Sequence, residues 1–162
     1  MNEDDVTRLA RRLANLAKKR RVDIVAAESC TGGGVATAIT RISGSAKYFE
    51  RGFVTYSNIA KKEMLGVSQK TLARHGAVSE EVAIEMARGA LKRSHADVSV
   101  AVTGIAGPGG GVPGKPVGTV HFAWGVRNGP VQTRRFRFKG DRAAVRLQSV
   151  YVAIHGLIDL LR

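Results

Sequence analysis

Three small reactive residues stand directly before three glycines in the stretch VAAESCTGGGVATAI, residues 25–39. A serine hydroxyl such as that of Ser29 can attack a carbonyl carbon when nearby backbone N–H groups hold the developing oxyanion. Cys30 offers a second nucleophile, although a small thiol at a tight turn is more often a part-buried packing residue. The alternative is that Ser29 and Thr31 only cap a helix and that the glycines at 32–34 only permit close packing.

A serine nucleophile needs a base, and no standard motif supplies one here. Ala27 and Thr31 replace the two glycines of G-x-S-x-G, and Gly32 stands where S-x-x-K needs its lysine. The histidines, which show no spacing typical of a shared site, are at positions 75, 95, 121 and 155. A lysine of the stretch VTYSNIAKKEM can act as the base if burial lowers its pKa. Because adjacent helical residues point about 100° apart, at most one of Lys61 and Lys62 faces a cleft, and spacing leaves that choice open.

A glycine- and proline-rich loop spans residues 104–116. Gly109 to Lys115 matches the G-x-x-x-x-G-K of a P-loop, but Pro116 stands where a Ser or Thr should hold magnesium, and a strand is expected next. We therefore reject a P-loop. Loops of this length inside compact domains are usually functional, and glycine N–H groups can hold a phosphate. We expect no metal site, because no His, Cys, Asp or Glu group has ligand spacing.

Helical and strand patterns alternate along the chain. Helices are predicted over residues 4–20, 31–42, 79–94 and 141–161, with a short one after residue 57. Strands are predicted at 23–27, 52–57 and 97–104, and in a hairpin of 117–126 and 131–138. We expect one domain, residues 1–162, with an α/β fold: a three-layer α/β/α sandwich with a mixed sheet. The candidate regions all follow the carboxyl ends of strands, where α/β proteins place their sites.

Composition narrows the class of protein. The 162 residues are 44% hydrophobic and 24% charged, as in ordinary globular chains, and no apolar run reaches the roughly 18 residues that cross a bilayer. One cysteine and an N-terminus unlike a signal peptide predict a cytoplasmic protein. The net charge of +13 attracts polyanions or steers a phosphorylated ligand into a cleft. With 6% aromatic residues and no recognition motif, we do not expect a nucleic acid partner.

Six blocks in series resemble the CinA C-terminal domain family in its stand-alone form, the bacterial nicotinamide-mononucleotide amidohydrolases. The blocks are AESCTGG (27–33), ERGFVTYSNIAKKEMLGV (50–67), HGAVSEEVAIEMARGAL (75–91), ADVSVAVTGIAGPGGG (96–111), KPVGTVHFAW (115–124) and GDRAAVR (140–146). The resemblance implies hydrolysis of the carboxamide of nicotinamide mononucleotide (NMN). The products are nicotinic acid mononucleotide and ammonia, in pyridine nucleotide salvage. It also implies a serine-lysine mechanism without metal or cofactor.

The resemblance assigns roles to four residues near the reacting bond. Ser29 corresponds to the nucleophile, and Lys61, rather than its neighbour, corresponds to the general base. Tyr56 is expected to position or polarise the reacting groups. Thr103 is expected beside the serine and the lysine.

The resemblance also implies a substrate pocket shaped by backbone groups and by an arginine. Arg142 of the GDR block is the first choice for the cation that meets the anionic end of the substrate, and Arg146 is the second. The residues expected around the substrate or its oxyanion are Cys30, Thr31, Gly32, Gly33, Gly104 and Gly107.

Three other functions stay open on the sequence alone. The first is an amidohydrolase of the same mechanism that acts on a different amide. The second is a non-enzymatic partner protein linked to competence or DNA repair, and the third is a module that binds NMN without turning it over. The partners expected are a small-molecule substrate and water, without a membrane. The resemblance and the apolar terminal helices also favour a homo-oligomer.

Overall fold

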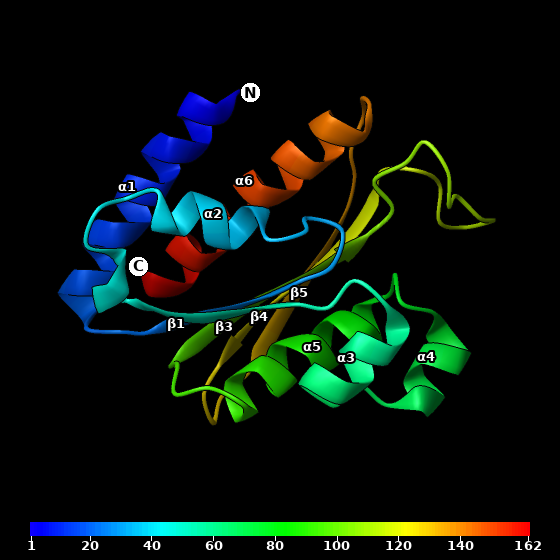
Figure 1. The fold of residues 1–162 in the computed structure, drawn as a ribbon, viewed down its shortest axis with the longest axis horizontal. Helices are drawn as coiled ribbons and strands as arrows, with labels where there is room; N and C mark the ends of the chain where they lie inside the picture. The colour runs from blue at the N-terminus through cyan, green and yellow to red at the C-terminus, as the bar shows by residue number, and fades with distance from the viewer.

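The computed structural model describes residues 1–162 and contains a five-stranded sheet between two layers of helices (Figure 1). The strands are β1 (Ile24–Glu28), β2 (Phe49–Val54), β3 (Val98–Gly104), β4 (Thr119–Val126) and β5 (Val131–Arg137). The helices are α1 (Glu3–Arg20), α2 (Gly34–Thr40), α3 (Asn58–Leu65), α4 (Gln69–His75), α5 (Glu80–Lys92) and α6 (Arg142–Leu161), with a short 3-10 helix η1 (Ser45–Lys47). The predicted α/β sandwich with a mixed sheet is confirmed.

The strands follow the order β2-β1-β3-β4-β5 across the sheet. β1 pairs in parallel with β2 on one side and with β3 on the other, whereas β4 is antiparallel to both β3 and β5. Strands buried on both faces are usually near-continuous apolar runs, and β1 and β3 fit this description apart from a few polar residues. The carboxyl ends of β1, β2 and β3 therefore meet at one edge of the sheet.

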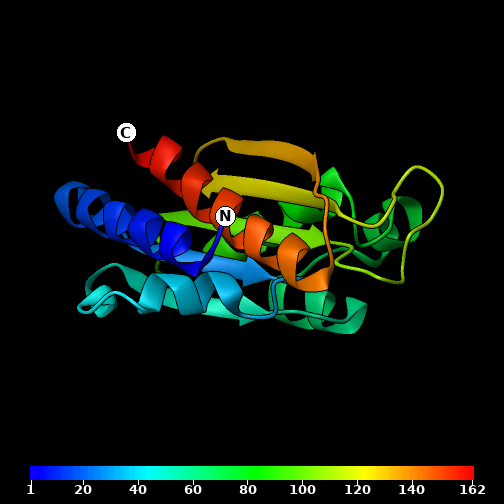
Figure 2. The same cartoon turned by 90° about the horizontal axis from the view of Figure 1, so that it is seen from above.

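Two hydrophobic cores hold the three layers together. α1, α2 and α6 cover one face of the sheet, and α3, α4 and α5 lie on the other, as Figures 1 and 2 show from two sides. The first core has 27 buried residues and the second has 14.

α6 is long and apolar enough, by length and composition, to cross a membrane. Here it packs into the first core through Val145, Ile154, Leu157 and Ile158, so we describe it as a core helix.

Three local predictions need correction. β2 begins at Phe49 rather than at residue 52, and it ends before the loop that carries the candidate tyrosine. α2, predicted over 31–42, starts later because Gly33 has a φ of 97°, a left-handed conformation outside the helix. α4 was not predicted, because no apolar pattern indicates it. Its start depends on the Ser68 side chain, which accepts a hydrogen bond from Lys70 N.

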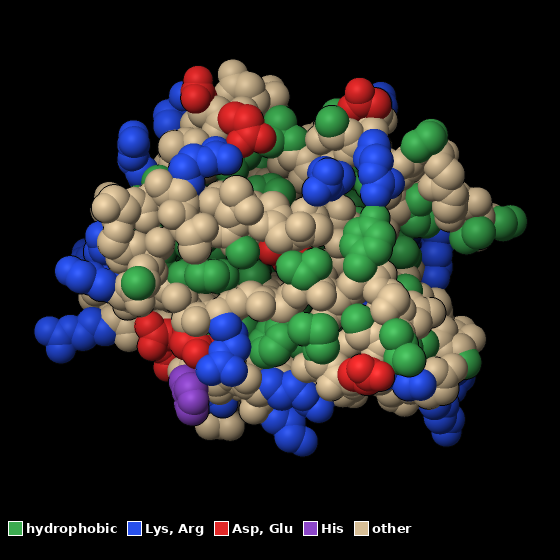
Figure 3. Space-filling model, viewed as in Figure 1, with side chains coloured by type: hydrophobic (Ala, Val, Ile, Leu, Met, Phe, Trp, Pro, Cys, Tyr) green, Lys and Arg blue, Asp and Glu red, His purple; other side chains and the backbone are tan.

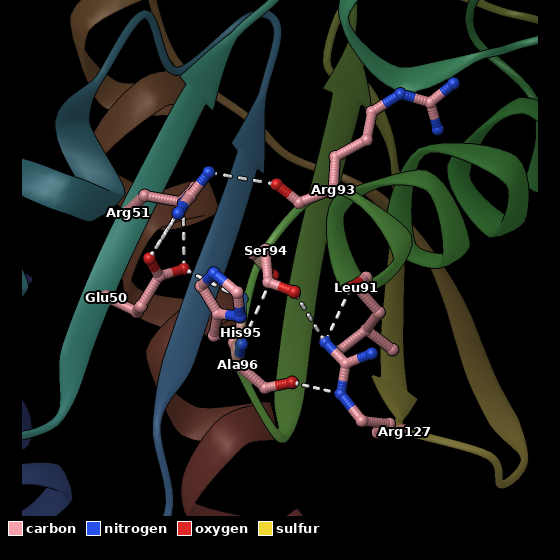
Figure 4. A network of polar contacts seen from close by, with 8 residues as sticks. All are labelled: Glu50, Arg51, Leu91, Arg93, Ser94, His95, Ala96 and Arg127. Atoms are coloured by element: carbon pink, nitrogen blue, oxygen red, sulfur yellow. Dashed lines mark hydrogen bonds and ion pairs between the residues drawn. The ribbon is translucent and has the colours of Figure 1, made fainter.

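A polar network lies at the amino ends of β2 and β3 and at the carboxyl end of the antiparallel β4, opposite the edge where the candidate residues gather (Figure 4). Arg127 donates to three backbone carbonyls, those of Leu91, Ser94 and Ala96. Glu50 pairs with Arg51 at 2.7 Å, and Arg51 donates to the carbonyl of Arg93. These contacts hold the segment that follows α5, and they join it to β2 and to the turn after β4.

The positive charge is distributed over the surface that Figure 3 draws. Lys and Arg side chains stand apart from one another around the rim, and apolar and uncharged atoms occupy most of the middle of this face. The net charge of +13 therefore does not form one dense band on this side of the molecule.

Candidate active site

Ser29 and Lys61 are in contact at the carboxyl edge of the sheet. The Lys61 Nζ atom lies 2.9 Å from Ser29 Oγ, 2.9 Å from the carbonyl oxygen of Thr55 and 3.5 Å from that of Tyr56. Only 1% of Lys61 is exposed, and this burial lowers the pKa of its amine from the ordinary 10.5. A neutral amine has two N–H groups and one lone pair. With two carbonyl oxygens as acceptors, the lone pair is left for the Ser29 hydroxyl.

The local structure explains why this lysine, and not its neighbour, reaches the serine. The Ser57 side chain caps the start of α3, so Lys61 lies in the first turn of that helix. Helical side chains lean toward the N-terminus, and this directs the amine back to the strand ends. Lys62 points elsewhere and is exposed. On the other side, Ser29 N donates to the carbonyl of Val102 at 2.9 Å and extends the pairing of β1 with β3.

A cavity of about 250 Å³ opens in front of Ser29. Eight of the twelve residues singled out in the sequence line it: Ser29, Cys30, Tyr56, Lys61, Thr103, Gly104, Gly107 and Arg142. The other four line a neighbouring hollow against α1, α2 and α6 instead: Thr31, Gly32, Gly33 and Arg146. No histidine lines the cavity, and its only charged side chains are Lys61 and Arg142.

Arg142 joins three segments at the outer part of this cavity. Its guanidinium, at the start of α6, donates to the carbonyl of Gly107 at 2.8 Å and to the hydroxyl of Tyr56 at 2.7 Å. The tyrosine hydroxyl therefore faces the arginine, while the residue as a whole is 59% exposed. Both acceptors are uncharged, so the guanidinium keeps a full positive charge. Arg146 is placed differently, because it donates to the carbonyl of Thr31 at 3.2 Å.

Thr103 and Cys30 complete the inner wall. Thr103 is buried, and its hydroxyl donates to the carbonyl of Ala77 at 2.8 Å. Cys30 is buried as well, and burial, with a smaller contribution from the Glu28 carboxylate, raises the pKa of its thiol to about 12. Since a thiol reacts as its thiolate, Cys30 is a poor nucleophile near neutral pH. The hydroxyl beside the buried amine is the better candidate.

Glu28 is a buried group that the sequence interpretation missed. Its carboxylate accepts hydrogen bonds from Val35 N at 2.7 Å, from Ala36 N at 3.1 Å and from the Thr31 hydroxyl at 2.7 Å. Two N–H groups in the first turn of α2 are therefore occupied by the chain's own carboxylate and are not free for an anion. Thr31 does not cap the helix either, because Gly33 is the N-cap residue and makes no side-chain bond. The sequence feature that could have identified Glu28 is an acidic residue at the end of an apolar strand.

Three backbone N–H groups of the turn after the serine, those of Cys30, Thr31 and Gly33, donate to no backbone carbonyl. Ser29 N and Gly32 N donate to the carbonyls of Val102 and Ser29. Of the three unpaired groups, Cys30 N and Thr31 N follow the serine directly in the chain. A hydroxyl, a buried amine and the N–H group of Cys30 belong to residues that line one cavity, and such groups are the parts needed for attack on a carbonyl carbon. No group of three or more His, Cys, Asp or Glu side chains is placed to hold a metal ion.

Comparison with known proteins gives consistent similarities. The family model described as the CinA C-terminal domain matches residues 6–161. The chain is 52% identical to nicotinamide-nucleotide amidohydrolase PncC of Escherichia coli (strain K12) over 157 residues, 97% of this chain and 95% of that protein. It is 50% identical to PncC of Pseudomonas putida, covering 97% of this chain and 98% of that one. The crystal structure of the competence/damage inducible protein CihA from Agrobacterium tumefaciens superimposes with a TM-score of 0.95 at 49% identity, covering 98% of this chain and 96% of that chain.

Proposed function

This chain belongs to the CinA C-terminal domain family, and from that premise we propose that it hydrolyses the carboxamide of NMN to nicotinic acid mononucleotide and ammonia. It is an enzyme of the amidohydrolase class, the class named for relatives that share 50% and 52% of its residues over nearly its whole length. The finer proposal is a serine-lysine mechanism in a single-domain protein that acts in cytoplasmic pyridine nucleotide salvage.

One observation carries the mechanism: the buried Lys61 amine lies 2.9 Å from the Ser29 hydroxyl with two carbonyl oxygens beside it. A buried lysine without a carboxylate partner is expensive to keep charged. The neutral form is the one that can accept a proton. The geometry thus supports Lys61 as the base and Ser29 as the nucleophile.

In the first half of the proposed reaction, Ser29 Oγ bonds to the amide carbon as its proton passes to Lys61 Nζ. The carbonyl oxygen becomes an oxyanion, for which the proposed donors are the N–H groups of Cys30 and Thr31, since neither donates to a backbone carbonyl. The C–N bond then breaks, and Lys61 returns the proton to the departing nitrogen, which leaves as ammonia. An ester on Ser29 remains.

In the second half, water replaces ammonia on the same groups. Lys61 accepts a proton from the water as its oxygen attacks the ester carbon. The bond to Ser29 Oγ breaks, and the proton on Lys61 restores the serine hydroxyl. The product is the nicotinic acid carboxylate. The same base, Lys61, thus acts in both halves of the reaction, as is usual in hydrolysis through a covalent intermediate.

Arg142 is the proposed anchor for the phosphate. It is the only charged side chain on the cavity wall besides Lys61, and its present partners are neutral. Charge-assisted hydrogen bonds are roughly twice as strong as neutral ones, so a phosphate competes well with the Tyr56 hydroxyl and the Gly107 carbonyl. Tyr56 would then position Arg142 rather than touch the amide. Arg146 lies outside this cavity and stays the second choice.

The test is ammonia release from NMN by the purified chain and three variants. Ser29→Ala and Lys61→Ala should each lose turnover, while Lys62→Ala, an exposed neighbour on the same helix, should keep it. The assay is run without added metal and again with a chelator, and the rate should survive both. Nicotinamide riboside and other amides are tested separately as alternative substrates.

Each outcome of this test decides between functions. A wild type that turns over another amide but not NMN overturns the proposed substrate. Activity retained in Ser29→Ala overturns the nucleophile. A wild type that binds NMN, measured by calorimetry, without releasing ammonia overturns the enzymatic proposal in favour of a binding module.

A further inference from the structure

Glu28 is a buried acid that the proposed reaction does not use. It is the last residue of β1, directly before Ser29, and only 1% of it is exposed. No Lys, Arg or His side chain lies within 4.0 Å of its carboxylate to form a salt bridge. Burial of an unpaired carboxylate is costly unless hydrogen bonds compensate, so the contacts of this group must be strong and well placed.

Those contacts close a ring around the nucleophile. Oε1 accepts from the Thr31 hydroxyl and from Val35 N, both at 2.7 Å, and Oε2 accepts from Ala36 N at 3.1 Å. The side chain therefore joins the end of β1 to the first turn of α2 and encloses the turn that carries Ser29. Of the backbone N–H groups in that turn, those of Cys30, Thr31 and Gly33 donate to no backbone carbonyl, and the first two directly follow Ser29.

The backbone of Glu28 connects the same place to the base. Its carbonyl oxygen accepts from Thr55 N at 2.8 Å, and the carbonyl of Thr55 is one of the acceptors around Lys61 Nζ. One residue thus holds the serine turn through its side chain and supports the lysine's surroundings through its backbone.

We propose that Glu28 is a positioning residue for the reaction: its carboxylate holds the Ser29 turn so that the N–H groups of Cys30 and Thr31 face the oxyanion. This inference rests on the proposed function. An ordinary helix cap does not need such an arrangement, because a Ser, Thr, Asp or Asn at the N-cap position would satisfy α2 locally. Here the N-cap is Gly33, and the capping carboxylate comes from the strand on the other side of the nucleophile.

The direction of the effect separates positioning from simple electrostatics. A negative charge near a developing oxyanion opposes it, so removal of that charge alone should speed the reaction. Removal of a positioning contact should slow it, because an oxyanion hole depends on donors fixed in advance. Glu28→Gln keeps the shape and one acceptor oxygen, but its amide N–H group meets the N–H donors of α2.

The experiment compares NMN with its thioamide analogue in the wild type and in Glu28→Gln. We expect kcat for NMN to fall about 10- to 100-fold, as for other supporting contacts of catalytic groups, with KM changed less than about twofold. Sulfur is a weak hydrogen-bond acceptor, so the thioamide gains less from the oxyanion hole. The ratio of the amide rate to the thioamide rate should therefore fall with kcat. Thr31→Val removes only the hydrogen bond from the Thr31 hydroxyl to Glu28. It should lower kcat for NMN and the amide-to-thioamide rate ratio as well, but by less than Glu28→Gln does.

Leu13→Ala, in the core and remote from the cavity, is the control for lost stability. It should lower the melting temperature and leave kcat and the rate ratio unchanged. An unchanged ratio in both Glu28→Gln and Thr31→Val, or a higher kcat in either, overturns the inference. If Glu28→Gln does not fold, Thr31→Val alone decides by the same ratio. A wild type without turnover on NMN overturns the proposed function instead, so the two failures are distinguishable.

Discussion

Replacement of Lys61 by Met tests the buried amine through two independent pH dependences. Methionine is a flexible apolar residue of similar length, so it removes the proton acceptor while filling the space between α3 and β1. Lys62→Met, at the exposed neighbouring position, is the matched control because it deletes the same amine from the same helix.

The expected effect on catalysis follows from the fraction of neutral amine. At the ordinary pKa of 10.5, about one amine in 3,000 is neutral at pH 7, and each pH unit by which burial lowers that pKa raises the fraction about tenfold. A general base contributes about 10²- to 10⁴-fold. Lys61→Met should therefore lower kcat/KM for NMN at least about 100-fold. In the wild type kcat/KM should rise with pH and reach its plateau below pH 10.5.

The same lowered pKa makes the stability of the wild type depend on pH. Unfolding restores the ordinary value, so between the folded pKa and 10.5 the unfolded chain binds more protons than the folded chain. The free energy of unfolding then rises with pH across this window, by up to about 1.4 kcal/mol per pH unit. That contribution is fully present above 10.5 and is lost as the pH falls through the folded pKa. Lys61→Met lacks it.

The assay is urea unfolding of the wild type and both variants at several pH values, beside product formation corrected for the rate in buffer alone. The difference in unfolding free energy between the wild type and Lys61→Met should change with pH, whereas the difference from Lys62→Met should not. Two results would refute the reasoning that burial makes Lys61 a base. One is an unfolding free energy that rises with pH no more steeply in the wild type than in Lys61→Met. The other is a kcat/KM that rises with pH only near the ordinary pKa of a lysine.

Four further outcomes are expected. Ser29→Ala should lose turnover by at least about 1,000-fold and still bind NMN in calorimetry with a Kd within about threefold of the wild type. Arg142→Ala should raise KM for NMN about 10-fold or more, since a charge-assisted contact is worth about 1.5–3 kcal/mol, and should change KM for nicotinamide riboside little. Cys30, with its pKa raised to about 12 by burial, should react slowly with iodoacetamide in the native chain and quickly in urea, measured by mass spectrometry. Gly89→Ala should cost about 1–3 kcal/mol or more in urea unfolding, because its Cβ would overlap the carbonyl of Leu65 in α3.

The order of helices and strands was predictable because the apolar residues repeat with clear periods. β1 and β3 are short apolar runs, and the apolar stripes of α1 and α6 return every three or four residues. The three candidate regions then had to meet, since parallel neighbours share one carboxyl edge. α4 escaped prediction because a seven-residue helix with one buried residue, Leu72, shows almost no periodicity.

The choice between Lys61 and Lys62 was beyond the sequence pattern, since two adjacent residues of the same type have the same local signal. Burial of one amine depends on how α3 docks against the end of β1, which is a tertiary property. The placement of Arg142 and Arg146 is similar. Both are exposed residues one turn apart on α6, yet only Arg142 lines the cavity in front of Ser29. The resemblance to a known family, and not the spacing, supplied the order of preference in both cases.

Glu28 changes how the site must bind an anion. Glycines ahead of a helix usually suggest a phosphate cradle made of free N–H groups, but here a carboxylate already occupies the first turn of α2. A phosphate at that place would meet a like charge at short range. We therefore expect the phosphate of the proposed substrate to bind elsewhere on the cavity wall, where Arg142 is the only cation apart from Lys61. In the proposed reaction, the turn at Ser29 would then bind the carbonyl, and the start of α6 would bind the phosphate.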